Sequence, residues 1–137
     1  PKRGDLEALA RDLGVTHIIH FLGEIADPLP LIAAADCFVL SATEEGLGTS
    51  VLDAMALGIP IVATRAGGIP EMLEGGAGIL TPVGDPSALA SGVAQVLTQP
   101  AVAQALLARA TARVADFSAA GMAEGVLRVY RSLVLER

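Results

Sequence analysis

The sequence predicts an α/β fold, with a parallel sheet of about four strands and helices on both faces. Its strand candidates are short and continuously apolar, as strands are when both faces of their sheet are buried. Segments whose apolar residues recur at helical spacing separate these runs. Strands and helices alternate along the chain without an internal repeat, which is typical of a parallel sheet covered by helices.

The first part of the chain contains two expected helices and two expected strands. Apolar residues at helical spacing predict a helix that ends at Gly14. A β-prone run at 17–22 predicts the first strand. Asp27 and Pro28 are typical of a helix start, and a short helix follows them. The apolar run at 37–40 predicts the second strand.

The remaining elements alternate in the same order. Glycines and prolines stand where the apolar runs stop, so they set the expected boundaries. We expect strands at 59–63 and 78–80, and helices at 49–57, 70–73 and 86–97. Two more helices complete the chain, and the apolar stripe of the last one predicts packing in the core.

Length and composition limit the possible classes of protein. The 137 residues fit one domain, and a hydrophobic content of 53% argues against disorder. The net charge is −6 and the basic residues are scattered, so no nucleic-acid partner is expected. The single cysteine, Cys37, excludes an internal disulfide. With no apolar run of transmembrane length and no secretion signal, we expect a cytoplasmic location.

One segment, residues 41–64, combines features that bind anions. It reads SATEEGLGTSVLDAMALGIPIVAT, which is a strand end, two acids, a glycine loop, a helix and a strand. Ligands of parallel α/β folds bind outside the carboxyl ends of the strands. Gly46 and Gly48 let the backbone approach a ligand, because they carry no Cβ atom. The helix that opens near Thr49 points free N–H groups there, which favours a phosphate or diphosphate.

Two carboxylates accompany this loop. Glu45 precedes it and Asp53 lies one turn inside the helix, and each can accept two hydrogen bonds from a vicinal diol. A phosphate cradle with two such acceptors indicates a nucleotide-sugar site. Structural alternatives remain open: Asp53 could form a capping box with Ser50, Glu45 could be a solvated loop acid, and the glycines could serve the turn alone.

This segment resembles the family-four, group 1 retaining glycosyltransferases of the GT-B fold. They carry two acids separated by seven residues in a pattern close to E-G-F-G-x-x-x-L-E-A-M-A-x-G-x-P-V-V-A, which Glu45 and Asp53 match. Further segments match in family order: FLGEI (21–25), AAADCFVLSA (33–42), GGIPEML (67–73), AGILTPVGDPSALASGV (77–93) and YRSLV (130–134). The resemblance implies a Rossmann-like, incomplete C-terminal domain over residues 1–137, with the acceptor-binding N-terminal domain absent.

The resemblance also implies roles. Glu45 is the expected catalytic residue and faces the donor sugar, whereas Asp53 binds the ribose hydroxyls. Glu71 is either a donor contact or an acid that supports a helix dipole. The other expected donor-binding residues lie in two glycine-containing loops: Gly46, Leu47, Gly48, Thr49, Gly67 and Gly68. The donor would be a UDP-, GDP- or ADP-sugar, and no metal or cofactor is expected.

The sequence departs from the family pattern in three ways. Asp53 is one methylene shorter than the usual Glu, and Leu47 replaces the common Phe. The family also has two strands before this region, carrying an Arg and a Lys that neutralise the diphosphate, and this chain lacks them. Those strands would lie between the strands at 17–22 and 37–40, so we expect exposed sheet edges that favour self-association.

Three functions are compatible with these observations. The first is the donor-binding part of a retaining glycosyltransferase that transfers a sugar to an acceptor hydroxyl, a part inactive without its N-terminal domain. The second is a truncated module that only binds nucleotide or forms a homo-oligomer through its sheet edges. The third is a fragment of a GT-B-like sugar-nucleotide epimerase, which would need further acids and a His that we cannot place here.

Overall fold

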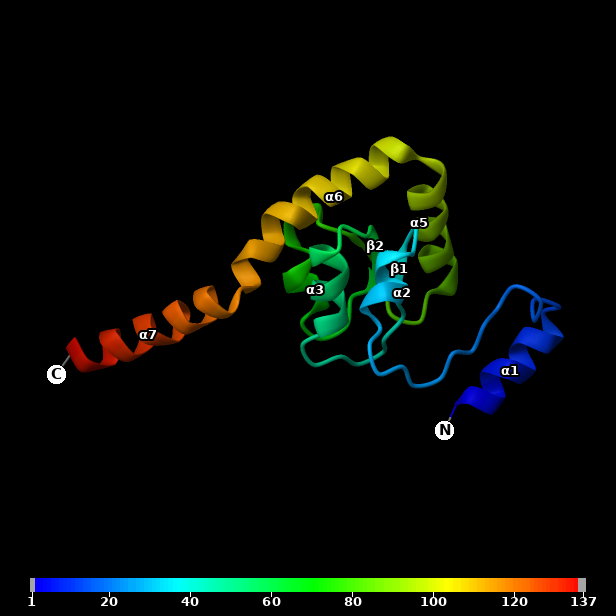
Figure 1. Ribbon diagram of the computed structural model, residues 1–137, viewed down its shortest axis with the longest axis horizontal. Coiled ribbons are helices and arrows are strands. Elements are labelled where there is room, and N and C mark those ends of the chain that lie inside the picture. The colour runs from blue at the N-terminus through cyan, green and yellow to red at the C-terminus, as the bar shows by residue number, and fades with distance from the viewer. Residues whose placement is uncertain (1, 136–137) are drawn as a thin grey trace.

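Three parallel strands form the centre of the protein. The computed structural model describes residues 2–135. Its strands are β1 (Phe38–Leu40), β2 (Ile61–Thr64) and β3 (Ile79–Thr81), in the order β1-β2-β3. Val39 pairs with Val62 in the first ladder, and both ladders are parallel (Figure 1).

Helices connect the strands and complete the chain, which confirms the predicted α/β class. The short turns of 3-10 helix are η1 (Glu74–Gly76) and η2 (Ala115–Phe117). The α-helices are α1 (Arg3–Asp12), α2 (Leu29–Ala33), α3 (Thr49–Ala56), α4 (Ile69–Met72), α5 (Pro86–Thr98), α6 (Pro100–Val114) and α7 (Ala119–Leu135).

The central strand β2 divides the core into two layers. Alternate residues of a strand face opposite sides of the sheet. Ile61 and Ala63 therefore belong to the layer that contains residues of α3 and α4, whereas Val62 packs with residues of α5 and α6. A Cβ on Gly92 would lie 2.8 Å from Cγ1 of Val62, so a glycine is needed for α5 to pack this closely. Helices thus cover both faces, as predicted.

The predicted strand at 17–22 is wrong, and the sheet has three strands rather than about four. The described chain offers this run no neighbouring strand, and an isolated strand leaves its backbone N–H and C=O groups without ladder partners. Val15, Ile19 and Phe21 instead line a small hollow with the apolar side chains of α1. Figure 1 shows α1 standing away from the sheet, joined to it by an irregular segment.

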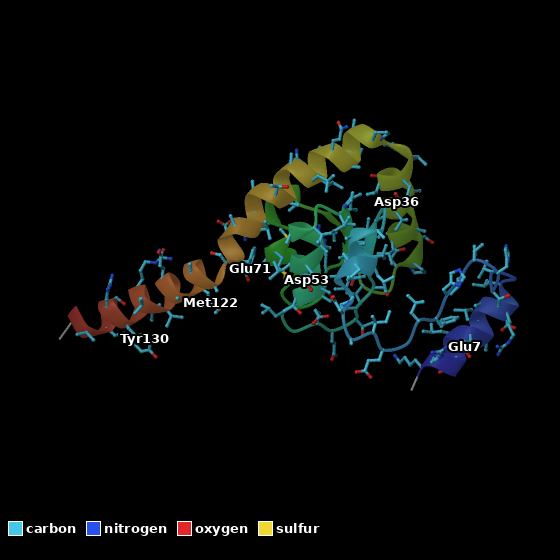
Figure 2. All side chains as sticks on the ribbon, in the orientation of Figure 1. Glu7, Asp36, Asp53, Glu71, Met122 and Tyr130 are labelled. Atoms are coloured by element: carbon cyan, nitrogen blue, oxygen red, sulfur yellow. The ribbon has the colours of Figure 1, made fainter. Side chains whose placement is uncertain are left out.

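The last helix, α7, extends away from the sheet (Figure 1). Met122 and Tyr130, both labelled in Figure 2, are 69% and 63% exposed. The prediction that this apolar stripe packs in the core is therefore wrong: its amphipathic pattern requires a covering surface, and residues 2–135 do not provide one. Neither α7 nor any other helix of the described range has the length and apolar character needed to cross a membrane.

Candidate functional site

The glycine loop lies between β1 and α3, where the sequence predicted it. Gly48 is the N-cap of α3 and has a φ of 62°, in the left-handed region that favours glycine. A Cβ there would also approach Cε of Met72 to 3.3 Å. No side chain caps α3, so the N–H groups of Thr49 and Ser50 in its first turn remain available to a ligand.

The start of α3 also excludes the structural alternative for Asp53. A capping box would need Ser50 at the N-cap, because the partner acid stands three residues after the cap. The observed N-cap is Gly48, which places Asp53 too far along the helix to close such a box. Asp53 is half-buried, and its carboxylate makes no hydrogen bond or ion pair within residues 2–135. That carboxylate can therefore accept hydrogen bonds from a ligand.

Glu45 is bound to the loop that it precedes. Its Oε1 accepts hydrogen bonds from the backbone N–H groups of Gly46, at 3.0 Å, and Gly48, at 3.3 Å. The side chain is half-buried, so Glu45 is not a freely solvated acid. These two amides are among those expected to meet the donor. The carboxylate oxygen of Glu45 thus accepts hydrogen bonds from two of the amides that the sequence assigned to donor binding.

A second glycine loop packs directly against the first. The N–H of Gly68 donates to the carbonyl of Gly46 at 3.2 Å. A Cβ on Gly67, which has a φ of +49°, would lie only 1.6 Å from the carbonyl oxygen of Glu45. Only glycine fits at position 67. The structure thus brings together the two loops that the sequence assigned separately to the donor site.

Glu71 lies beside this loop pair, near the start of the second helix of the site. It belongs to α4, which contacts α3. Figure 2 labels Glu71 and Asp53 on these two elements. The Glu71 side chain is exposed and makes no hydrogen bond or ion pair in the described part of the chain. Leu47 and Thr49 are exposed as well, whereas Gly48 between them is buried.

The carboxyl ends of the strands hold a hollow that the sequence reasoning missed. The Thr64 hydroxyl donates to the carbonyl of Ala42 at 2.6 Å and so ties the segment after β1 to the end of β2. A cavity of about 170 Å³ opens there, lined in part by Ser41, Thr43 and Asp85. Each of these polar residues follows a strand closely in the sequence, and this position was the sequence signal from which the hollow could have been predicted.

Metal-binding side chains do not converge in the part of the chain that the structure describes. No group of three or more His, Cys, Asp or Glu residues there is placed to hold an ion. Cys37 lies beside β1, and burial raises the pKa of its thiol. The groups that can bind a ligand at this site are therefore backbone N–H groups, hydroxyls and the carboxylates of Glu45, Asp53 and Glu71.

Comparison with known proteins places this geometry in a family. The model of the family described as glycosyl transferases group 1 matches residues 1–99. The chain is 33% identical over 134 residues to LpsE of Rhizobium meliloti, a lipopolysaccharide core biosynthesis glycosyltransferase, over 96% of this chain and 39% of that protein.

Solved structures share the fold. Sucrose-phosphate synthase from Thermosynechococcus elongatus matches with a TM-score of 0.82 and 28% identity, over 99% of this chain and 35% of that one. Anabaena HepE in complex with UDP and glucose matches with a TM-score of 0.77 and 29% identity, over 94% of this chain and 36% of that one. The chain thus spans about a third of these proteins and 39% of LpsE.

The family match covers most of the chain, and the structural matches extend over nearly all of it. The predicted family and fold class are therefore confirmed. With its glycine loops packed together at the carboxyl ends of a parallel sheet, this chain belongs to the group 1 glycosyl transferases and carries part of their GT-B fold.

Proposed function

We propose that this domain binds the nucleoside-diphosphate sugar donor of a retaining glycosyltransferase. The observation that carries the proposal is the contact between the two glycine loops at the uncapped start of α3. Helix N-termini bind phosphate groups, because their free N–H groups and dipole favour negative charge. HepE, a solved relative of similar fold, holds UDP and glucose.

The positions of the side chains support a proposed role for each part of the site. The diphosphate lies at the first turn of α3, and the Asp53 carboxylate accepts hydrogen bonds from the ribose hydroxyls. Glu45 faces the donor sugar. For the sugar or diphosphate to reach the amides of Gly46 and Gly48, the Glu45 carboxylate must first leave them. Donor binding then exchanges one pair of hydrogen bonds for another, so its net gain from these two amides is small.

Charge balance supports the proposal that catalysis uses cations from elsewhere in the parent enzyme. A helix N-terminus supplies about half of one positive charge, and a diphosphate carries about two or more negative charges. The described surroundings add the carboxylates of Glu44, Glu45, Asp53 and Glu71. Arg65 directly follows β2 and can supply one cation at this edge of the sheet, and we assign the others to the family strands that carry the Arg and Lys. They would stabilise the departing diphosphate while the acceptor hydroxyl attacks from the same face.

Calorimetric titration with UDP, GDP and ADP tests the proposal. We expect one nucleotide to bind saturably, with the weak affinity of an incomplete site, and Asp53→Ala to abolish that binding. Asp36→Ala is the matched control, because Asp36 is exposed and precedes β1 at the opposite end of the strand. Figure 2 shows the two aspartates well apart. Equal loss in both variants, or no binding at millimolar nucleotide, would contradict the proposed role.

The open edge of β1 favours a second candidate function, self-association. Within residues 2–135, β1 pairs with β2 on one side only, and Val39 is 41% exposed. An unpaired edge strand can extend its ladder with another chain. Sedimentation equilibrium should then show a dimer that Val39→Lys converts to a monomer. Val83→Lys, a similarly exposed valine after β3, should leave the dimer intact, whereas a monomeric wild-type protein would exclude this candidate.

A further inference from the structure

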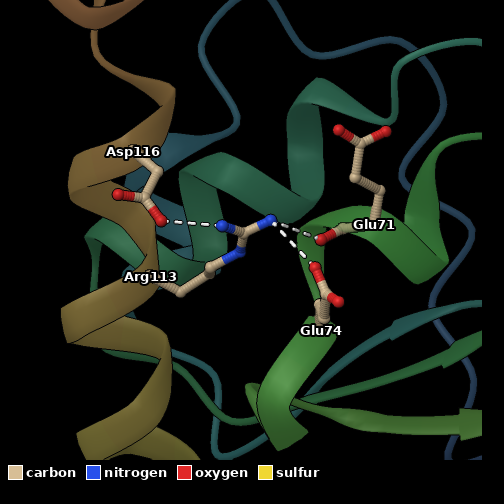
Figure 3. A network of polar contacts seen from close by, with 4 residues as sticks. All are labelled: Glu71, Glu74, Arg113 and Asp116. Atoms are coloured by element: carbon tan, nitrogen blue, oxygen red, sulfur yellow. Dashed lines mark hydrogen bonds and ion pairs between the residues drawn. The ribbon is translucent and has the colours of Figure 1, made fainter.

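Arg113 connects the last turn of α6 to the segment that carries Glu71. Its Nη2 donates to the backbone carbonyl of Glu71 at 2.9 Å, and the same atom lies 3.6 Å from the Glu74 carboxylate. Its Nη1 donates to Asp116 at 2.7 Å (Figure 3). The guanidinium also lies 4.9 Å from the centre of the Phe117 ring. One side chain thus joins elements that are far apart in the sequence.

The position of this arginine has a cost in free energy. Its side chain is only 25% exposed, and its Nε is the one buried side-chain nitrogen or oxygen without a hydrogen-bond partner in the described range. A buried donor without a partner destabilises a folded protein. Within residues 2–135, the two Nη atoms make all polar contacts of the Arg113 side chain, so they are the groups through which Arg113 can fix geometry. The geometry that it fixes is that of the Glu71 carbonyl, not of the Glu71 carboxylate, which points away from Arg113 in Figure 3.

Contacts lead from this carbonyl to the glycine loops. Glu71 belongs to α4, whose neighbouring residues Ile69 and Met72 stand against Gly48. The residue before α4, Gly68, donates its N–H to Gly46. A shift of α4 would therefore move both the N-cap of α3 and the hydrogen bond between the two loops.

We propose that Arg113 is a positioning residue for the two glycine loops. It holds α4 through the Glu71 carbonyl, and α4 in turn holds Gly48 and Gly68 in the arrangement that receives the donor. The proposal rests on the proposed function only for its effect on nucleotide affinity. Its structural part, the placement of the glycine amides, can be tested without any nucleotide.

The test compares three variants of the full chain. Arg113→Met removes the guanidinium and keeps most of the aliphatic stem. Arg113→Lys keeps the charge and one donor that can reach the Glu71 carbonyl, and it serves if the Met variant does not fold. Arg109→Met is the matched control, because Arg109 is an exposed arginine one turn earlier on α6. Each variant is measured by thermal unfolding, by amide NMR and by UDP titration.

We expect Arg113→Met to shift the amide resonances of Gly46, Gly48 and Gly68 more than those of the sheet. Its Kd for UDP should rise roughly threefold to tenfold, where tenfold corresponds to about 1.4 kcal/mol, the size of one charge-assisted hydrogen bond. Arg113→Lys should recover part of the affinity, and Arg109→Met should change neither quantity.

Two results separate the possible failures. If Arg113→Met lowers the unfolding temperature but leaves the glycine resonances unchanged, Arg113 serves stability alone and the positioning role is refuted. If the wild-type protein binds no UDP while the glycine resonances still shift in Arg113→Met, the proposed function fails and the positioning role stands.

Discussion

Replacing Gly67 by alanine should disrupt the two glycine loops more than adding a methyl group at any other glycine of these loops. The added Cβ would lie 1.6 Å from the Glu45 carbonyl oxygen, whereas real Cβ atoms essentially never approach closer than 3.0 Å. The loops would have to separate by about 1.4 Å, the difference between these two distances. Such a movement breaks the hydrogen bond from Gly68 to Gly46, now 3.2 Å long.

The expected cost has two parts. An L-residue in the left-handed region costs about 1–2 kcal/mol, and the lost hydrogen bond about 0.5–1.5 kcal/mol. Gly67→Ala should therefore lower the free energy of unfolding by about 1.5–3.5 kcal/mol. Gly58→Ala is the control: Gly58 has a φ of +70°, but a Cβ there would meet nothing within 4 Å. Gly58→Ala should lose only the roughly 1–2 kcal/mol that the left-handed conformation costs an L-residue.

Denaturant unfolding and UDP titration of both variants test this reasoning. Gly67→Ala should be less stable than Gly58→Ala by about 1 kcal/mol, and its UDP affinity should fall about tenfold or more. Gly58→Ala should bind UDP like the wild-type protein. Equal stabilities, together with unchanged UDP binding in Gly67→Ala, would show that the two loops do not touch as described.

Three further changes test other parts of the structure. Gly46→Ala should change the free energy of unfolding by no more than about 0.5 kcal/mol, because a Cβ there meets nothing within 4 Å. The added methyl group would stand where the donor approaches, so UDP-sugar binding measured by calorimetry should weaken. Unchanged binding would place the donor elsewhere. Thr64→Val should lower the free energy of unfolding by about 1–2 kcal/mol in denaturant unfolding, since it removes the 2.6 Å hydrogen bond to the Ala42 carbonyl. A loss near zero would show that this hydrogen bond does not stabilise the fold. Burial raises the pKa of Cys37, so its alkylation by iodoacetamide should be slower than that of a free cysteine, and alkylation at the rate of a free thiol would contradict this. Folding stability should fall as pH rises above the pKa of the unfolded thiol, because the unfolded chain loses that proton first.

The sequence was sufficient for elements whose boundaries are local. The helix after Gly48 and the strand before Thr64 were predicted to within a few residues, because apolar periodicity and glycine stops are local signals. A candidate site could be proposed for the same reason, since the two acids and the glycines lie in one continuous segment.

Properties that depend on distant neighbours could not be predicted. The run at 17–22 has the composition of a strand, but a strand also needs an adjacent strand, and residues 2–135 supply none. Likewise, nothing in the local pattern indicated that Gly67 would touch the Glu45 carbonyl or that Arg113 would reach Glu71, 42 residues away. The stripe on α7 was recognised, but periodicity does not identify the surface that covers a stripe.

The most direct test of the proposed donor site is an amide NMR titration of the chain with UDP. We expect saturable shifts concentrated on the amides of Gly46, Gly48 and Thr49, because UDP displaces the Glu45 carboxylate from two of them and meets the first turn of α3. Resonances that stay unchanged at millimolar UDP, or shifts confined to the opposite end of the sheet near Asp36, would contradict the assignment of this loop as the donor site.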